Sequence, residues 1–190
     1  MAAPPHARRR LYATVLDLAA TNPVEELTAT EICRAAQVHR STFAEYAASA
    51  ADLLRAALRE QLDDIRARFL TGPDAAAPNA AAETSRAVLA HIESHEAIYQ
   101  RGLLSAGGGD LHAMLAEHFR GSVRELEAAG AIRPSFRAPG ATTRFVHEST
   151  VRFIASGSIG ILEAWLSEPA PRDPEHFVAA FEGLTAAARA

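Results

Sequence analysis

Apolar residues recur along this chain with the period of an α-helix. Leu11, Val15 and Leu18 are separated by four and then three residues, which places them on one face of a helix predicted over residues 8–21. No segment alternates apolar and polar residues in the manner of a half-buried strand. The helical period predicts further helices over residues 28–36, 40–46, 49–69, 81–100, 110–129, 142–166 and 174–188. The pattern therefore predicts an all-α fold.

Residues with special backbone preferences mark the ends of these helices. Pro23 should stop the first helix, because the residue before a proline avoids the helical conformation. Thr28 and Glu31 have the spacing of a capping box, in which each side chain bonds the backbone of the other residue. Ser49 predicts a second N-cap. Glycine and proline clusters predict loops over residues 71–80, 107–109 and 134–140.

Residues 28–47 have the organisation of a helix-turn-helix. Two short helices joined at Gln37 follow a bracing first helix, a frame that presents the second short helix to the major groove of DNA. The apolar residues spaced to meet inside this small bundle are Ile32, Ala35, Val38 and Phe43. The side chains expected to contact bases or phosphates are Thr28, Thr30, His39, Arg40, Ser41, Thr42 and Tyr46. Arg8, Arg9 and Arg10 are candidates for an additional, flexible phosphate contact.

Residues 8–58 resemble the N-terminal domain of the tetracycline-repressor (TetR) family of transcription regulators. The matching stretches are RRRLYATVLDLAA and LTATEICRAAQVHRSTFAEYAASAADLLRAAL. They share the threonine before the second helix, the I-x-x-A-A-x-V and S-T-F segments, and a serine-capped fourth helix with D-L-L. The resemblance implies a homodimer that binds a palindromic operator in double-stranded DNA. It also implies a divergent C-terminal domain whose small-molecule effector, of unknown identity, releases the DNA.

A second resemblance lies in the C-terminal half, where residues 153–166 follow the F-x-x-x-G-x-x-G-x-x-x-x-W-L pattern of many family members. Glycine within a helix costs about 1 kcal/mol relative to alanine, so two glycines together indicate a packing reason. The predicted dimer interface comprises Gly157, Gly160, Ile161 and Trp165. Packing of these residues inside the chain is the alternative.

Polar side chains on otherwise apolar helices often face an internal cavity. On this ground the predicted effector pocket is lined by His95, Tyr99, Met114, His118, His147 and Arg152. His91 lies one helical turn from His95, so the two rings could share a metal ion with another histidine; hydrogen-bonded histidines are the alternative. The second reading is favoured because no carboxylate spacing supports a metal, and no metal or cofactor is predicted. Met114 is also a candidate for the ordinary core.

Charge and composition narrow the functional class. The chain has 190 residues, 19 arginines, no lysine and a formal net charge of −4. Residues 1–70 hold nine arginines and nine acidic residues, so the predicted DNA-binding part is neutral rather than strongly basic. No apolar run is long enough to span a membrane and no secretory signal is evident, so a cytoplasmic location without membrane association is expected. The single cysteine, Cys33, excludes an intrachain disulfide.

The predicted organisation is a helix-turn-helix DNA-binding domain at residues 1–48, followed by a ligand-binding and dimerisation domain at 49–190 whose residues 49–70 form a connecting helix. About nine helices are expected in all. Ala44 and Ala50 stand where family members often carry an aromatic residue and a lysine, and Glu45 adds a negative charge. The alternative is therefore a helical dimer that binds a ligand or protein but no longer reads DNA. No sequence motif of an enzyme is evident, and a non-enzymatic protein is predicted.

Overall fold

The computed structural model describes residues 5–71, 79–104, 109–131 and 139–187, and these residues form helices joined by short turns and loops, without a strand. The α-helices are α1 (Pro5–Thr21), α2 (Ala29–Ala36), α3 (Arg40–Tyr46), α4 (Ala50–Leu70), α5 (Ala80–Ser94), α6 (Glu96–Leu104), α7 (Gly109–Ala128), α8 (Thr143–Ser167) and α9 (Pro174–Ala187). A 3-10 turn, η1 (Val24–Glu26), lies between α1 and α2. No helix in the described part of the chain combines the length and apolar character needed to cross a bilayer. The predicted all-α fold is confirmed.

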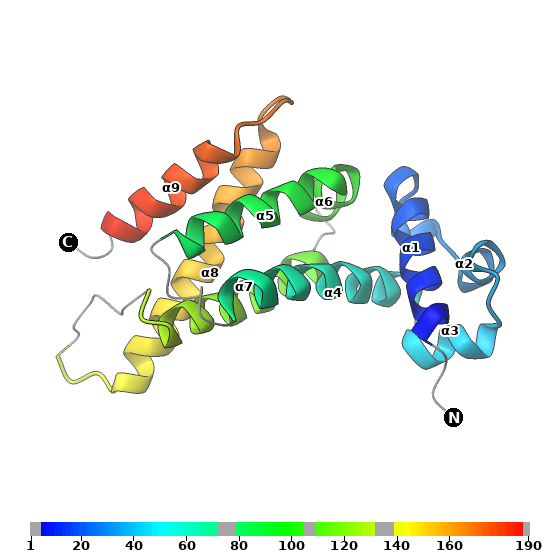
Figure 1. Ribbon diagram of the computed structural model, residues 1–190, viewed down its shortest axis with the longest axis horizontal. Coiled ribbons are helices and arrows are strands. Elements are labelled where there is room, and N and C mark those ends of the chain that lie inside the picture. The colour runs from blue at the N-terminus through cyan, green and yellow to red at the C-terminus, as the bar shows by residue number, and fades with distance from the viewer. Residues whose placement is uncertain (1–4, 72–78, 105–108, 132–138, 188–190) are drawn as a thin grey trace.

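The helices form two regions, which Figure 1 shows side by side. The head consists of α1 to α3 with η1 (blue to cyan), and the body consists of α4 to α9. Helix α4 begins against the head and runs into the body, where α5, α7, α8 and α9 surround it or pack beside its neighbours. Buried side chains continue without a break from Leu11 of α1 through Leu58 of α4 to Leu162 of α8. The head and the body therefore share one hydrophobic core.

The predicted helix caps are present. The Thr28 hydroxyl accepts a hydrogen bond from the Glu31 backbone N–H at 3.2 Å, and the Thr28 backbone N–H donates to the Glu31 carboxylate at 2.9 Å. The Ser49 hydroxyl accepts from the backbone N–H of Asp52 at 3.1 Å and begins α4. These bonds satisfy amide groups that have no partner within their own helix. Local sequence therefore sets the start of both helices.

The structure corrects two predictions. The segment predicted as one helix over residues 81–100 is divided into α5 and α6, because His95 has non-helical backbone angles (φ −122°, ψ 27°). The His95 ring bonds Gln61 of α4 at 2.9 Å, a tertiary contact that the continuing apolar period does not reveal. In the head, Ala35 is exposed, and Cys33 and Ala36 of α2 are buried beside Ile32 instead. Helix α2 is thus rotated relative to the predicted core face.

Candidate nucleic-acid interface and ligand cavities

Helix α3 is anchored to the head by one large side chain and exposes most of the others. Phe43 is buried in the core at 3% exposure, while His39, Arg40, Ser41 and Glu45 are exposed. Thr42 and Tyr46 are half-buried, and Tyr46 packs against the core. The anchored phenylalanine fixes the rotation of a helix of only seven residues. Its polar side is thereby presented outward, as a helix that enters a DNA groove requires.

Thr30 of α2 and Arg40 of α3 meet on this outer surface. The Arg40 Nη1 atom donates a hydrogen bond to the Thr30 hydroxyl at 3.2 Å, and both residues are exposed. The structure thus brings together two of the predicted DNA-contacting residues from different helices. Thr28 is occupied by its capping box with Glu31, whose pKa is lowered mainly by the Thr28 hydroxyl. The role of Thr28 in the structure is therefore to start α2.

The arginines predicted as a flexible contact belong to a regular helix. Arg8, Arg9 and Arg10 lie within α1 and are exposed. The Arg8 guanidinium lies 3.4 Å from the Glu60 carboxylate of α4 and 5.9 Å from the centroid of the Tyr12 ring. Arg8 thus links α1 to α4, which corrects the prediction of a flexible arm in the described structure.

The central histidines of the predicted pocket are held by partners inside the body. The Nε2 atom of His91 and the hydroxyl of the fully buried Tyr99 lie 2.9 Å apart. Burial, with smaller contributions from the His95 and His118 rings, lowers the pKa of His91 to about 4. Burial also raises the pKa of Tyr99. The ring nitrogen Nδ1 of His118 lies 3.2 Å from the Asp63 carboxylate of α4, and burial lowers the pKa of His118. These contacts support the hydrogen-bonded histidines that the sequence favours.

The other predicted pocket residues lie in different surroundings. Met114 is buried in the core, and Arg152 is exposed on α8. The partly exposed His147 places its Nδ1 atom 3.0 Å from the Glu127 carboxylate. None of the residues predicted to line the effector pocket borders either of the two cavities described next. The prediction depended on helix rotation, which residue spacing does not determine.

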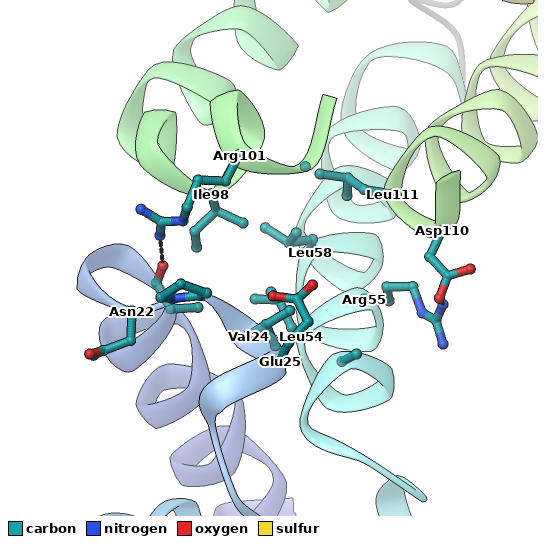
Figure 2. Close-up of a pocket in the computed structure, with 14 residues that line it drawn as sticks. Asn22, Val24, Glu25, Leu54, Arg55, Leu58, Ile98, Arg101, Asp110 and Leu111 are labelled. Atoms are coloured by element: carbon teal, nitrogen blue, oxygen red, sulfur yellow. Dashed lines mark hydrogen bonds and ion pairs between the residues drawn. The ribbon is translucent and has the colours of Figure 1, made fainter. Parts of the chain in front are cut away.

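One cavity, which we call the junction cavity, lies where the head meets the body and has a volume of about 440 Å³ (Figure 2). It is lined by residues of α1, α4, α6 and α7 and of the segment after α1, namely Ala19, Asn22, Pro23, Val24, Glu25, Ala51, Leu54, Arg55, Leu58, Ile98, Arg101, Gly102, Asp110 and Leu111. No sequence motif predicts it, because its walls come from segments far apart in the chain.

A smaller cavity of about 50 Å³ lies inside the body, among α4, α5, α7, α8 and α9. Most of its lining is apolar and includes Phe119, Phe177 and Phe181. Its hydroxyl groups donate to carbonyls one turn earlier in their own helices, as Thr84 does to Ala80 at 2.7 Å and Ser158 to Ile154 at 2.9 Å. The cavity is therefore small and mostly apolar, and the hydroxyl groups in its lining already have hydrogen-bond partners.

Helix α8 divides the predicted dimer-interface residues between its two sides. Phe153 is 66% exposed, and at the exposed Gly157 and Gly160 no atom beyond the adjacent residues and the local helix backbone lies within 4 Å of the position that a Cβ would occupy. Ile161 is half-buried against the core. Trp165 is buried, and its Nε1 donates to the Asp173 carbonyl at 3.0 Å, so its ring packs inside the chain. Packing within the single chain would therefore leave room for a larger residue at both glycines, whereas Trp165 belongs to the core.

Comparison with known proteins identifies solved structures with a similar fold. Neither a scan against protein-family models nor a search of curated proteins finds a match. Among solved structures, the chain is similar to a TetR-family transcriptional regulator from Streptomyces coelicolor, with 20% identity, a TM-score of 0.62, and coverage of 95% of this chain and 81% of that one. It is also similar to a TetR transcriptional regulator from Rhodococcus sp. RHA1, with 18% identity, a TM-score of 0.54, and coverage of 96% and 97%. Over nearly its whole length, the chain therefore has the fold of these TetR-family regulators.

Proposed function

We propose that this protein is a non-enzymatic, DNA-binding transcription regulator that reads a palindromic operator with α3. The observation that carries the proposal is the outward surface shared by α2 and α3, where Arg40 and Thr30 meet beside the exposed His39 and Ser41. Arginine recognises guanine or phosphate, and serine or threonine bonds either kind of group. Phe43 fixes this surface on a rigid frame, and the fold is that of known regulators.

The same proposal includes a homodimer formed through α8 and α9. Exposed Phe153 on α8 and Leu184 on α9 provide apolar area, while Gly157 and Gly160 leave room for a second backbone. A twofold dimer presents two α3 helices to half-sites one DNA turn apart, about 34–36 Å. A small molecule that changes this separation would release the operator. Repression relieved by an effector is the mode of regulation we propose.

The DNA-binding proposal is tested by selecting short DNA duplexes that bind the protein, at two salt concentrations. The pool contains random sequences and the DNA upstream of the protein's own gene. We expect enrichment of a palindrome whose binding weakens as salt rises, because phosphate contacts release counterions. Arg40→Ala should reduce affinity for that palindrome by about 1–3 kcal/mol. The matched control is Arg120→Ala on α7, which removes an arginine that pairs with Glu117 in the body. No enrichment at low salt, or equal affinities for Arg40→Ala and wild type, contradicts reading by α3.

Light scattering of the purified protein tests the dimer. Phe153→Glu should shift the mass in solution toward the monomer, because it places a charge at the proposed contact between two α8 helices. Leu104→Glu is the control, since Leu104 is also an exposed apolar residue but lies at the end of α6. A wild-type protein that remains monomeric while it binds the selected duplex would exclude the dimer.

The second candidate function is a helical module that binds a ligand or protein without reading DNA. The exposed Glu45 and Ala44 on α3 favour it, because an acidic residue opposes phosphate and an alanine offers no hydrogen bond. The duplex selection decides between the two candidates. Glu45→Gln sharpens the decision, since restored binding in this variant would show that the frame is intact and that one charge prevents reading.

A further inference from the structure

We propose that the junction cavity binds a small aliphatic carboxylate, with the carboxylate group held by Arg101 and the hydrocarbon chain by the apolar wall. We propose further that this binding weakens the contact between α6 and the end of α1. The binding site follows from the cavity itself. Its regulatory consequence rests on the proposed function, because it requires that the position of the head control DNA binding.

The walls of the junction cavity suit a hydrocarbon chain. Leu54 and Leu58 of α4, Ile98 of α6 and Leu111 of α7 are buried side chains that contribute to its lining. The described residues around the cavity include no aromatic ring, so the apolar surface is aliphatic. Its volume of about 440 Å³ lies within the range of about 300–1,000 Å³ typical of small-molecule sites.

The two arginines at the cavity have different partners. Arg55 bonds both Asp52 of its own helix and Asp110 of α7, so its charge is already balanced by carboxylates. Arg101 donates from Nη2 to the backbone carbonyl of Ala19, as the dashed line in Figure 2 shows. Among the described residues, none places a carboxylate within ion-pair distance of Arg101. The partly buried Arg101 is therefore the group to which an incoming anion would bind.

A bound carboxylate would compete with the Ala19 carbonyl for Arg101. A carboxylate is the stronger acceptor, because both partners are charged and the planar guanidinium can bond both oxygens. The bond from Arg101 to Ala19 joins α6 of the body to the last turn of α1 in the head. Loss of that bond would remove one restraint on the position of the head. The same side chain thus serves as ligand anchor and as link between the regions.

Titration calorimetry of the full chain without DNA tests the site, with sodium octanoate as the probe and octan-1-ol and octylammonium as its uncharged and cationic counterparts. We expect octanoate to bind the wild type at least about tenfold more tightly than either counterpart. Arg101→Gln keeps a donor for the Ala19 carbonyl but removes the charge, so it should abolish the preference for the acid. Arg120→Gln on α7 is the matched control and should bind octanoate as the wild type does.

Ala51→Leu provides an independent variant, because Ala51 lines the cavity and a larger side chain there would occupy part of it. We expect it to weaken octanoate without changing Arg101. Absence of octanoate binding to the folded wild type overturns the proposal. So does binding that survives both Arg101→Gln and Ala51→Leu, which would place the acid elsewhere. Tighter binding of octylammonium would assign the site to a cation, with Glu25 as its partner, and would also overturn it.

The regulatory step is measured separately, by the effect of octanoate on affinity for the selected duplex. Octanoate should weaken duplex binding by the wild type and leave that of Arg101→Gln unchanged. A protein that binds octanoate but no duplex keeps the site and excludes the proposed function. A protein that binds duplex but not octanoate keeps the function and excludes the site. Binding of both without mutual influence overturns the regulatory step alone.

Discussion

The head and the body differ in where they keep their polar side chains. In the head, the buried side chains are apolar, such as Leu11, Ile32 and Phe43, and the polar groups lie on the outer surface. All five buried polar residues of the described chain lie in the body, namely Thr84, His91, His118, Ser122 and Ser158. A frame with an apolar interior can offer its polar surface to a large partner. In the body, the two buried histidines pair with groups on other helices, His91 with Tyr99 and His118 with Asp63, so this region should respond to protonation.

The continuous core implies that the two regions unfold together. Removal of a side chain that both regions share should cause the largest loss of stability. Leu58 of α4 is fully buried, belongs to the common core and lines the junction cavity. Leu58→Ala should lower the free energy of unfolding by about 2–5 kcal/mol, through lost burial and an enlarged cavity. Urea denaturation followed by circular dichroism would measure it, with the exposed Arg59→Ala as control. Two separate transitions in the wild type would contradict the shared core.

The buried histidines should make the body sensitive to acid. The folded-state pKa of His91, about 4, lies below its usual 6.5, so the folded protein favours the neutral ring. This costs no stability above pH 6.5. As the pH falls from 6.5 to 4, the unfolded chain takes up the proton first, and stability should fall by roughly 3 kcal/mol. Burial lowers the pKa values of His95 and His118 as well, which adds to the loss.

Denaturation at a series of pH values would measure this dependence. His91→Gln should flatten the decline, because the substitution removes the titrating ring while glutamine can still bond the Tyr99 hydroxyl. His112→Gln is the control, since His112 is exposed on α7. Equal slopes for wild type and His91→Gln would show that the acid sensitivity has another source.

The head should respond to changes at its helix caps. Thr28→Ala removes the hydroxyl that caps α2 and half of the capping box, so the free energy of unfolding should fall by about 1 kcal/mol. Thr30→Ala, two residues further along, should have a smaller effect on stability. Within the described part of the chain, the Thr30 hydroxyl bonds the Arg40 side chain and caps no backbone amide. Thermal unfolding would compare the variants. A larger loss for Thr30→Ala would contradict this assignment.

The smallest expected effect is a gain. Gln37 ends α2 with a left-handed backbone (φ 54°, ψ 47°), and its N–H bonds the Arg34 carbonyl. Glycine adopts this conformation without the Cβ penalty, so Gln37→Gly should raise the free energy of unfolding by up to about 1 kcal/mol. Glycine also gives the unfolded chain more conformational freedom than glutamine does, and this reduces the gain in stability. A marked drop in the melting temperature would show that the glutamine side chain stabilises the turn.

Much of the head could be predicted from neighbouring residues, and less of the body could. The capping box of Thr28 and the bounds of α3 follow from short-range patterns, as does the cap at Ser49 where α4 leaves the head, and the structure confirms all three. The division of α5 from α6 was missed because the apolar period continues through His95, where the backbone leaves the helical conformation and the ring bonds Gln61, 34 positions away. The exposure of Ala35 was missed because a short helix offers few apolar residues to fix its rotation.

The sequence by itself determined the helical class, most helix ends and the identity of the outward polar residues on α3, because caps, proline and apolar period act over a few residues. Only the tertiary structure decided which polar groups share a space. It paired His91 with Tyr99, buried Trp165 inside the chain, and formed the junction cavity from distant segments. The rotation of each helix and its crossing with the next set these relations. They arise from packing of the whole core, which no local pattern encodes.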